Sequence, residues 1–244
     1  MNSSQIKLIR SLKKKKNRIK HNSFIVESHK NVIELLNSNY EIREVFATKE
    51  WIEKNQPNFD VLIQKTSIKD LNRVSNLTSI SDVLAIAKIS EIKKDFDFRK
   101  INIALDGIQD PGNLGTIIRT CDWFGVKNIF CSLDTVDFYN SKVIQTSMGS
   151  FTRVNVVYTD LNELIKNNSN DIKIYNTVLN AKNLDLVNTE DSEKSLIIFG
   201  NESHGISSSL LKLAKNQISI KKKGKANSLN VASSCAIVLH KFCS

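Results

Sequence analysis

The sequence has few cysteines, and no two of them stand at a metal-binding spacing. It contains four cysteines and no C-x-x-C pair. Cys121, Cys131 and Cys235 lie inside apolar runs, whereas Cys243 does not. This pattern is typical of buried thiols and not of a zinc site or a disulfide framework, so we expect no metal. Thiols of this kind indicate a reducing compartment such as the cytoplasm.

Long apolar runs are also missing. The N-terminal stretch MNSSQIKLIRSLKKKK lacks the apolar core of a signal peptide. No segment approaches the roughly 18 consecutive apolar residues that a membrane-spanning helix requires. The sequence therefore predicts a cytoplasmic protein without a membrane partner.

Acidic residues are outnumbered by basic ones. The chain has 35 Lys and Arg against 25 Asp and Glu, with a net charge of +10 and a pI near 9.4. Such an excess favours a polyanionic partner, and a basic protein of some other kind is the alternative. Aromatic residues make up only 7% and form no interleaved stacking motif. For a nucleic-acid partner, this composition favours recognition through shape and phosphates over stacking on exposed bases.

The first part of the chain reads as a small α/β layer that forms one domain, residues 1–92. It opens with a predicted basic helix and then has β-type runs at residues 44–47, 61–63 and 83–89. This basic stretch contains Lys13, Lys14, Lys15, Lys16 and Arg18. A solvated basic tail is the alternative for these side chains. Residues 91–100 are charged and lack a sustained apolar face, so we expect a linker there.

The second predicted domain, residues 98–244, alternates strands with helices. The expected strands are residues 103–105, 128–132, 154–158, 173–178, 196–199 and 218–220. Helical stretches separate most of them, so the fold class is α/β, with a mainly parallel sheet covered on both faces. The last helix has small and apolar residues at a spacing suited to close helix contact, within the chain or between subunits. These are Leu229, Ala232, Ala236, Leu239 and Cys243.

The first of three informative blocks reads LDGIQDPGNLGTIIRTCDWFGV, residues 105–126. Pro111 and Gly112 make a turn, and Asn113 can cap the helix that follows. Arg119 lies on that helix away from its apolar stripe. Without further context, Asn113 is an ordinary cap and Arg119 a solvated residue.

The second and third blocks also place polar residues where strands end or helices begin. Gly200-Asn201-Glu202 follows an apolar strand, which is where α/β sheets bind ligands. Ser228-Leu229-Asn230 enters the last helix, and Ser228 is a natural cap. A plain turn and ordinary capping are the alternatives. One loop histidine, His204, has no evident partner and is not expected to be catalytic.

Together the three blocks resemble the SpoU (TrmH-like) family of the SPOUT RNA methyltransferases. That family carries D-P-x-N-x-G-x-x-x-R, and this chain matches it from Asp110 to Arg119. Its G-x-E and S-L-N-V motifs are matched at Glu202 and at residues 228–231. The usual proline after Ile220 is replaced by Lys221, and the residue before S-L-N, often glutamate, is Asn227. At these two positions the resemblance does not define the loop shape or the substrate.

The resemblance also covers the N-terminal part. FIVESHKNVIE, residues 24–34, is similar to the auxiliary domain joined to many SpoU enzymes, which is related to small ribosomal proteins that hold folded RNA. Ser28 stands where that domain typically has glycine. The resemblance thus implies an RNA substrate-binding domain in residues 1–92. It also implies that the basic residues Lys13, Lys14, Lys15, Lys16 and Arg18 contact the RNA backbone.

For the second domain, the resemblance implies a trefoil knot and S-adenosylmethionine as cofactor. The implied cofactor contacts are Thr177, Gly200, Ile220 and Leu229. The implied catalytic residues are Arg119, Asn113, Glu202, Ser228 and Asn230. Arg119 would act at the ribose 2′-hydroxyl, as a base or, in keeping with a guanidinium that holds its proton, as an electrostatic and positioning group.

The sequence therefore predicts an RNA ribose 2′-O-methyltransferase that acts on rRNA or tRNA. The resemblance also implies a homodimer that uses the last helix. A non-catalytic RNA-binding or ribosome-assembly factor with the same fold is the alternative. A nucleotide-dependent oxidoreductase is disfavoured, because GIQDPGNLG does not space its glycines as a dinucleotide-binding turn does.

Overall fold

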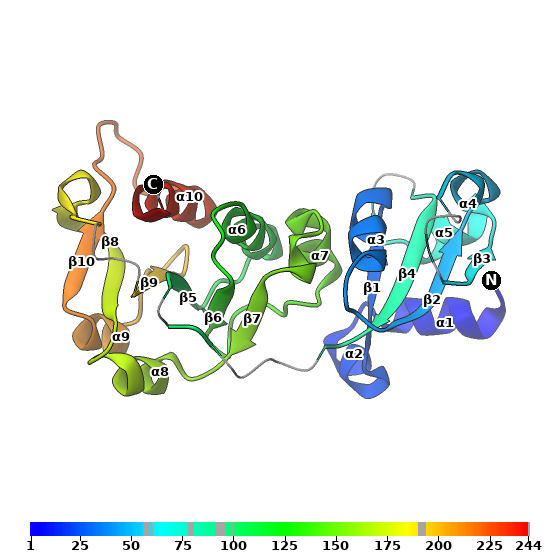
Figure 1. The fold of residues 1–244 in the computed structure, drawn as a ribbon, viewed down its shortest axis with the longest axis horizontal. Helices are drawn as coiled ribbons and strands as arrows, with labels where there is room; N and C mark the ends of the chain where they lie inside the picture. Colours follow the sequence, from blue (N-terminus) through cyan, green and yellow to red (C-terminus); the bar gives the residue numbers. More distant parts are fainter. Residues whose placement is uncertain are drawn as a thin grey trace. The chain divides into compact units, whose positions relative to one another are not determined.

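The computed structural model describes the chain except for residues 56–58, 60, 78–80, 91–95, 99, 190–193 and 244. The chain forms two compact units. Unit 1 comprises Met1–Glu91 and Asp137–Thr152, and unit 2 comprises Ile92–Val136 and Arg153–Ser244. The elements of each unit are labelled in Figure 1.

Unit 1 contains a four-stranded sheet in the order β1-β4-β2-β3. The strand β4 is antiparallel to β1 and β2, whereas β3 runs parallel to β2. The strands are β1 (Ser23–Glu27), β2 (Ile42–Ala47), β3 (Ile63–Lys65) and β4 (Val83–Lys88). The helices are α1 (Ser3–Ser11), α2 (Lys15–His21), α3 (His29–Leu36), α4 (Lys49–Asn55), α5 (Ile68–Val74), α7 (Ser141–Ser147) and the 3-10 turn η2 (Ser150–Thr152).

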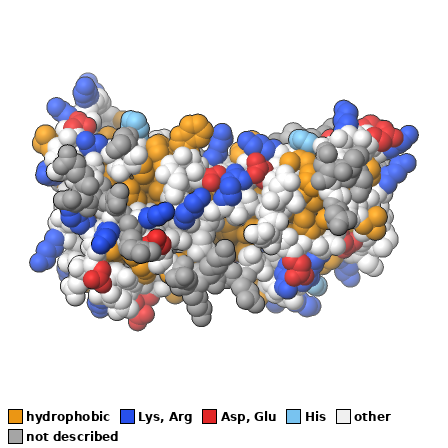
Figure 2. Space-filling model, in the orientation of Figure 1, with side chains coloured by type: hydrophobic (Ala, Val, Ile, Leu, Met, Phe, Trp, Pro, Cys, Tyr) orange, Lys and Arg blue, Asp and Glu red, His pale blue; other side chains and the backbone are white. Residues whose placement is uncertain are grey.

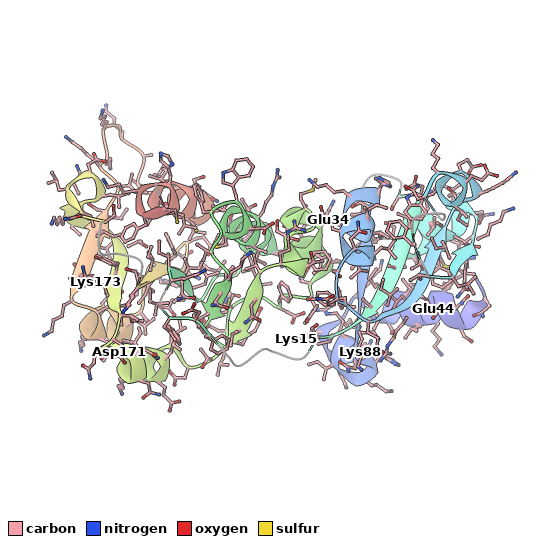
Figure 3. The ribbon with its side chains drawn as sticks, in the orientation of Figure 1. Lys15, Glu34, Glu44, Lys88, Asp171 and Lys173 are labelled. Carbon is pink, nitrogen blue, oxygen red and sulfur yellow. The ribbon has the colours of Figure 1, made fainter. Side chains whose placement is uncertain are left out.

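Residues 137–152 are part of the unit 1 core, although they lie in the middle of the predicted second domain. Phe24 of β1 contacts the rings of Tyr139 and Phe151 at centroid distances of 4.5 and 6.2 Å. Burial raises the pKa of the Tyr139 phenol, so it stays neutral in this aromatic cluster. A Cβ on Gly149 would come within 2.4 Å of Cγ of Glu34, which α3 carries (Figure 3). Glycine is therefore required where η2 meets α3.

Arg18, a predicted RNA contact, is only 5% exposed. Its guanidinium donates to Asp137 Oδ2 at 2.6 Å and to the carbonyl oxygens of Leu12 and Lys13 at 2.9 and 2.8 Å. A buried charge needs such partners, because burying it unpaired would be costly. The structure thus gives Arg18 a structural role.

The single basic helix expected near the N-terminus is instead two helices. The helix α1 ends at Ser11 and α2 begins at Lys15, so Lys13 and Lys14 lie between them. Lys13, Lys14, Lys15 and Lys16 are exposed, and Lys15 is labelled at the start of α2 in Figure 3.

Ser28 has a backbone conformation that favours glycine. Its φ of 78° and ψ of 146° lie close to a region that is essentially restricted to glycine. A residue with a Cβ in such a region costs on the order of 1–3 kcal/mol. The structure therefore gives a physical reason for the glycine that the auxiliary domain typically has at this position.

We expect Ser28→Gly to raise the free energy of unfolding by about 1 kcal/mol, since relief of strain exceeds the extra entropy of an unfolded glycine. Ser28→Ala is the matched control, because it keeps the Cβ and should change stability little. Chemical denaturation of both variants measures the difference. If alanine stabilises as much as glycine, backbone strain is not the cause.

Unit 2 contains a six-stranded sheet in the order β10-β8-β9-β5-β6-β7. Every neighbouring pair is parallel, which confirms the predicted α/β class and parallel sheet. The strands are β5 (Asn102–Asp106), β6 (Asn128–Cys131), β7 (Asn155–Tyr158), β8 (Lys173–Asn183), β9 (Ser195–Gly200) and β10 (Asn216–Ser219). The helices are α6 (Pro111–Trp123), α8 (Leu161–Asn168), α9 (Ser208–Leu213), α10 (Val231–Cys243) and the 3-10 turn η3 (Leu184–Leu186).

Helices cover both faces of this sheet, as predicted (Figure 1). Residues of α8 and α9 share a core with Phe130 and Ile198 on one face. The helices α6 and α10 pack together over the other face. None of the helices that the structure describes is long and apolar enough to cross a membrane.

The buried face of α10 differs in part from the predicted stripe. Ala232 and Leu239 are buried as expected, but Leu229 precedes the helix and is 51% exposed. The residues that α10 buries are Val231, Ala232, Cys235, Val238, Leu239 and Phe242. Leu229 is not part of the stripe because the helix begins at Val231. Cys235 and Phe242 are buried one position before the predicted Ala236 and Cys243, so the buried face is rotated relative to the predicted one.

The predicted buried thiols are confirmed at Cys121, Cys131 and Cys235, and Cys243 is exposed. Burial raises the pKa of the Cys121 and Cys131 thiols, so both stay protonated and unreactive near neutral pH.

Most of the predicted linker lies outside the described residues. Of its apolar residues, Phe96 and Phe98 are described, and both rings pack against Phe130 of the unit 2 core. The domain boundaries near residues 92–98 stay a prediction.

The strand order brings two loops together at the carboxyl edge of the unit 2 sheet. From β5 the chain moves to β6 on one side, whereas β9 is hydrogen-bonded to β5 on the other. A reversal of this kind is the place where open parallel sheets bind ligands. Here the loops that follow β5 and β9 occupy that position.

Candidate functional site

The loop after β5 is held in place by the start of α6. The Asp110 side chain accepts the backbone N–H of Asn113 at 2.8 Å, and Pro111 occupies the first turn of α6. Asp110 is therefore the N-cap, and Asn113 does not take the capping role that the sequence allowed for it. Both residues can cap a helix, but Asp110 is the last residue before it.

Because Asp110 caps the helix, the side chain of Asn113 can bond elsewhere. Its Nδ2 donates to Glu202 Oε1 at 2.7 Å, and its Oδ1 accepts from Asn230 Nδ2 at 2.9 Å. These partners lie 89 and 117 residues away in the sequence. One amide thus joins the three blocks that the sequence singled out.

Asn230 also starts the last helix. Its Oδ1 accepts the backbone N–H groups of Ala232 and Ser233 at 2.9 and 3.3 Å. The predicted cap, Ser228, is exposed and lies three residues before α10 begins. The assignment of the cap to Ser228 was therefore wrong, and Asn230 combines capping with the bond to Asn113.

The loop after β9 is a tight turn that Asn201 fastens to the loop after β5. Asn201 Nδ2 donates to the carbonyl oxygen of Gly107 at 2.6 Å. Its Oδ1 accepts the backbone N–H groups of Ser203 and His204 at 2.8 and 3.2 Å. Asn201 therefore positions the two residues that follow Glu202. Sequence reasoning missed this role, although Asn201 stands inside G-N-E.

A second bond between the same loops was also missed. The carboxylate of Asp106, at the end of β5, accepts the backbone N–H of Ser207 at 2.7 Å. An acidic residue that ends an apolar strand directly before a glycine was the available signal in the sequence. The Gly107 N–H in turn donates to the Ser132 hydroxyl at 2.8 Å, so the loop after β6 supports the same region.

Of the residues predicted to contact a cofactor, Thr177 lies on β8 and Gly200 ends β9, whereas Ile220 and Leu229 lie between β10 and α10. The Thr177 hydroxyl of β8 donates to the carbonyl oxygen of Ile198, two residues before Gly200. Ile220 directly follows β10 and is half-buried, and Leu229 is exposed. The pairing of β8 with β10 jumps here, from Asn176–Gln217 to Lys182–Ile218.

These residues fit a ligand with both polar and apolar parts. The exposed Leu229 and half-buried Ile220 offer apolar surface, and Gly200 ends β9 without a side chain. Thr177 adds a half-buried hydroxyl. We therefore retain the four predicted residues as candidate cofactor contacts.

Arg119 is exposed on α6 and does not join the network of Asn113, Glu202 and Asn230. It follows Asn113 by six residues, which at 3.6 residues per turn turns its side chain by about 240° around the helix axis. In the part of the chain that the structure describes, no residue forms an ion pair with Arg119. Its guanidinium is free to meet a ligand.

The geometry defines a class of protein: an α/β protein with a parallel sheet, whose ligand loops meet where the strand order reverses. Comparison with known proteins then gives the family. Residues 100–240 match the SpoU rRNA methylase family, and residues 3–93 match the MRM3-like substrate binding domain. The chain belongs to the SpoU rRNA methylase family, which confirms the resemblance found in its motifs.

Named relatives and solved structures agree with this assignment. A 23S rRNA (guanosine(2553)-2′-O)-methyltransferase of Bacillus subtilis is 28% identical over 98% of this chain and 95% of its own length. A TrmH-family protein from Porphyromonas gingivalis has a TM-score of 0.89 and 28% identity, covering 99% of this chain and 98% of its own. An AdoMet-bound rRNA methyltransferase from Sinorhizobium meliloti has a TM-score of 0.83 and 25% identity, covering 98% and 94%.

Proposed function

We propose that this protein transfers a methyl group from S-adenosylmethionine to a ribose 2′-hydroxyl of rRNA or tRNA. The observation that carries the proposal is the pair of hydrogen bonds from Asn113 to Glu202 and Asn230. It joins the residues that match the three motifs of a methyltransferase family. The relatives named above support the same reaction.

The bound cofactor supplies an electrophilic methyl group, and the chain supplies the geometry of the transfer. Asn113 is held by Glu202 and Asn230, so its amide is fixed at the loop edge. Most of the rate enhancement comes from holding the hydroxyl in line with the methyl group. Arg119 stabilises the negative charge that develops on the attacking oxygen. Ser228, next to Leu229, binds the ribose or its phosphate.

The proposal is tested by incubating the purified protein with methyl-labelled S-adenosylmethionine and total RNA from a strain that lacks the protein. We expect incorporation into RNA, and loss of one ribose 2′-O-methyl mark in the deletion strain relative to its parent. The mark that is lost identifies the nucleotide. RNA binding without any methyl transfer would instead favour a non-catalytic assembly factor.

Thr177, Gly200, Ile220 and Leu229 are proposed to hold S-adenosylmethionine. The last segment of unit 2 is proposed to form a trefoil knot, in keeping with the family. The four free cysteines fit a reducing cytoplasm.

The first RNA contact is proposed in unit 1, at Lys13, Lys14, Lys15 and Lys16. All four side chains are exposed. Attraction of this kind for RNA phosphates falls steeply with salt. Arg18 is left out because it is buried with Asp137.

We also propose a homodimer formed through α6 and α10. Trp123, the last residue of α6, is 85% exposed, and Ile237 of α10 is exposed as well. Large exposed apolar side chains on two packed helices are typical of an interface between subunits. An isologous contact would bring the same helices of both subunits together.

Trp123→Glu should convert the dimer to a monomer at micromolar concentration, since burying an unpaired carboxylate in an apolar interface is costly. Sedimentation velocity measures the change. Leu62→Glu is the matched control, because Leu62 is 84% exposed in unit 1 and outside the proposed interface. A monomeric wild-type protein, or equal effects of both variants, would contradict the dimer.

A further inference from the structure

The loop between β10 and α10, residues 220–230, carries an unexplained concentration of positive charge. Four of its residues are lysines within five positions, and all four are exposed: Lys221, Lys222, Lys223 and Lys225. Figure 1 shows the loop standing out from the rest of unit 2. Among the residues that the structure describes, none forms an ion pair with these lysines. We refer to residues 221–225 as the lysine loop.

The lysine loop is tethered to the candidate site. Its carboxyl end leads to Asn230, which is bonded to Asn113 at 2.9 Å and to the first turn of α10. Asn230 follows Lys225 by five positions, a distance that an extended chain spans with at most about 18 Å. The positive charges of the lysine loop therefore stay near Asn113 and Asn230 of the candidate site even if the loop moves.

None of the described ion pairs joins a lysine of the loop to a carboxylate of the candidate site. The carboxylates of Asp106, Asp110 and Glu202 accept hydrogen bonds from backbone or amide groups. S-adenosylmethionine has a net positive charge because of its sulfonium and amino groups, so lysines repel it as a whole. A polyanion that passes the site has the opposite charge.

We infer that the lysine loop binds the RNA phosphates that flank the target ribose. The inference rests on the proposed function and adds to it a second RNA contact, carried by unit 2 itself. One of its lysines, Lys221, stands where the family usually has proline. The loop would act on RNA affinity and on the placement of the strand, not on the chemical step.

The test removes charge from the loop without touching the cofactor residues. Lys221 is kept because it follows Ile220, a proposed cofactor contact. The loop variant is Lys222→Gln, Lys223→Gln and Lys225→Gln. The control removes three exposed lysines at the opposite edge of the same sheet, where β6, β8 and β9 begin. It is Lys127→Gln, Lys173→Gln and Lys194→Gln, of which Lys173 is labelled in Figure 3.

Filter binding to rRNA transcribed in vitro, between about 50 and 200 mM salt, gives the number of phosphate contacts. Each phosphate contact with a single strand contributes about 0.7 to the slope of log K against log salt concentration. Loss of three contacts should therefore lower the magnitude of that slope by about 2. We expect the KM for RNA to rise about 10- to 100-fold in the loop variant, with kcat at saturating RNA and the affinity for S-adenosylmethionine unchanged. The control should stay within about twofold of wild type.

Equal losses in both variants would overturn the inference, because total charge alone would then explain them. A fall in S-adenosylmethionine affinity confined to the loop variant would also overturn it. If the wild-type protein binds RNA through the loop but transfers no methyl group, the inference stands and only the proposed function fails.

Discussion

Arg119→Ala should lower methyl transfer by at least about 1,000-fold while the fold and the affinity for S-adenosylmethionine are retained. Arg119 is exposed, and no residue that the structure describes forms an ion pair with it. Its removal should therefore change the free energy of unfolding by no more than about 0.5 kcal/mol. A large loss of rate without a loss of stability would place Arg119 in the reaction.

Single-turnover transfer to RNA and calorimetric titration with S-adenosylmethionine measure the two effects separately. Arg119→Lys keeps one charge but loses the planar, two-pronged guanidinium. We expect it to recover part of the rate if charge stabilisation dominates. Lys127→Ala removes a distant exposed charge from the same unit and should behave like wild type. Wild-type transfer by Arg119→Ala would refute this role.

The second large effect is expected for Gly200→Ala. A Cβ at this position would lie 2.2 Å from the carbonyl carbon of Gly205 and 2.3 Å from the backbone nitrogen of Ile206. Both atoms belong to the backbone, and Asn201 and Gly205 exchange hydrogen bonds of 3.0 and 2.9 Å across the turn. The turn must open to admit the methyl group. Overpacking of this kind costs about 1–3 kcal/mol, and a clash with backbone belongs at the upper end.

Opening that turn would also move Asn201 and Glu202, so the bond from Asn113 to Glu202 should be lost. We expect at least about a tenfold loss of S-adenosylmethionine affinity together with the loss of stability. Thermal unfolding with and without the cofactor measures both.

Two other glycines of unit 2 serve as controls. Gly205 has a φ of 69° and open space around its Cβ position, so Gly205→Ala should cost about 1–2 kcal/mol through backbone strain alone. Gly224 has open space and no positive φ, so Gly224→Ala should change little. If Gly200→Ala were as stable as Gly224→Ala, the close approach would not matter.

Local patterns were enough to locate most strands and the two helices that frame the site. The strand predicted at residues 103–105 corresponds to β5, and the strand predicted at residues 196–199 corresponds to β9. Their parallel pairing follows from the helices between them, because parallel strands need long connections. The motifs at Asp110, Glu202 and Asn230 gave the family, since each is a short run of sequence that needs no structure to be read.

Contacts between distant parts of the chain could not be read in this way. The sequence treats Asn113 as a possible cap, and only the folded chain shows that Asp110 takes that role and leaves Asn113 to Glu202 and Asn230. Likewise, the sequence predicts Arg18 as an exposed cation, and only the structure shows that it bonds to Asp137, which is 119 residues away.

The sequence by itself therefore determined the class, the family and the identity of the residues at the ends of the strands. These properties depend on periodicity and on residues that are neighbours along the chain. Only the tertiary structure decided which of these residues bond to each other, which cation is buried, and that residues 137–152 pack in unit 1. The reason is physical: a side chain with several possible partners takes the one that folding brings within hydrogen-bonding distance, and no local pattern records that choice.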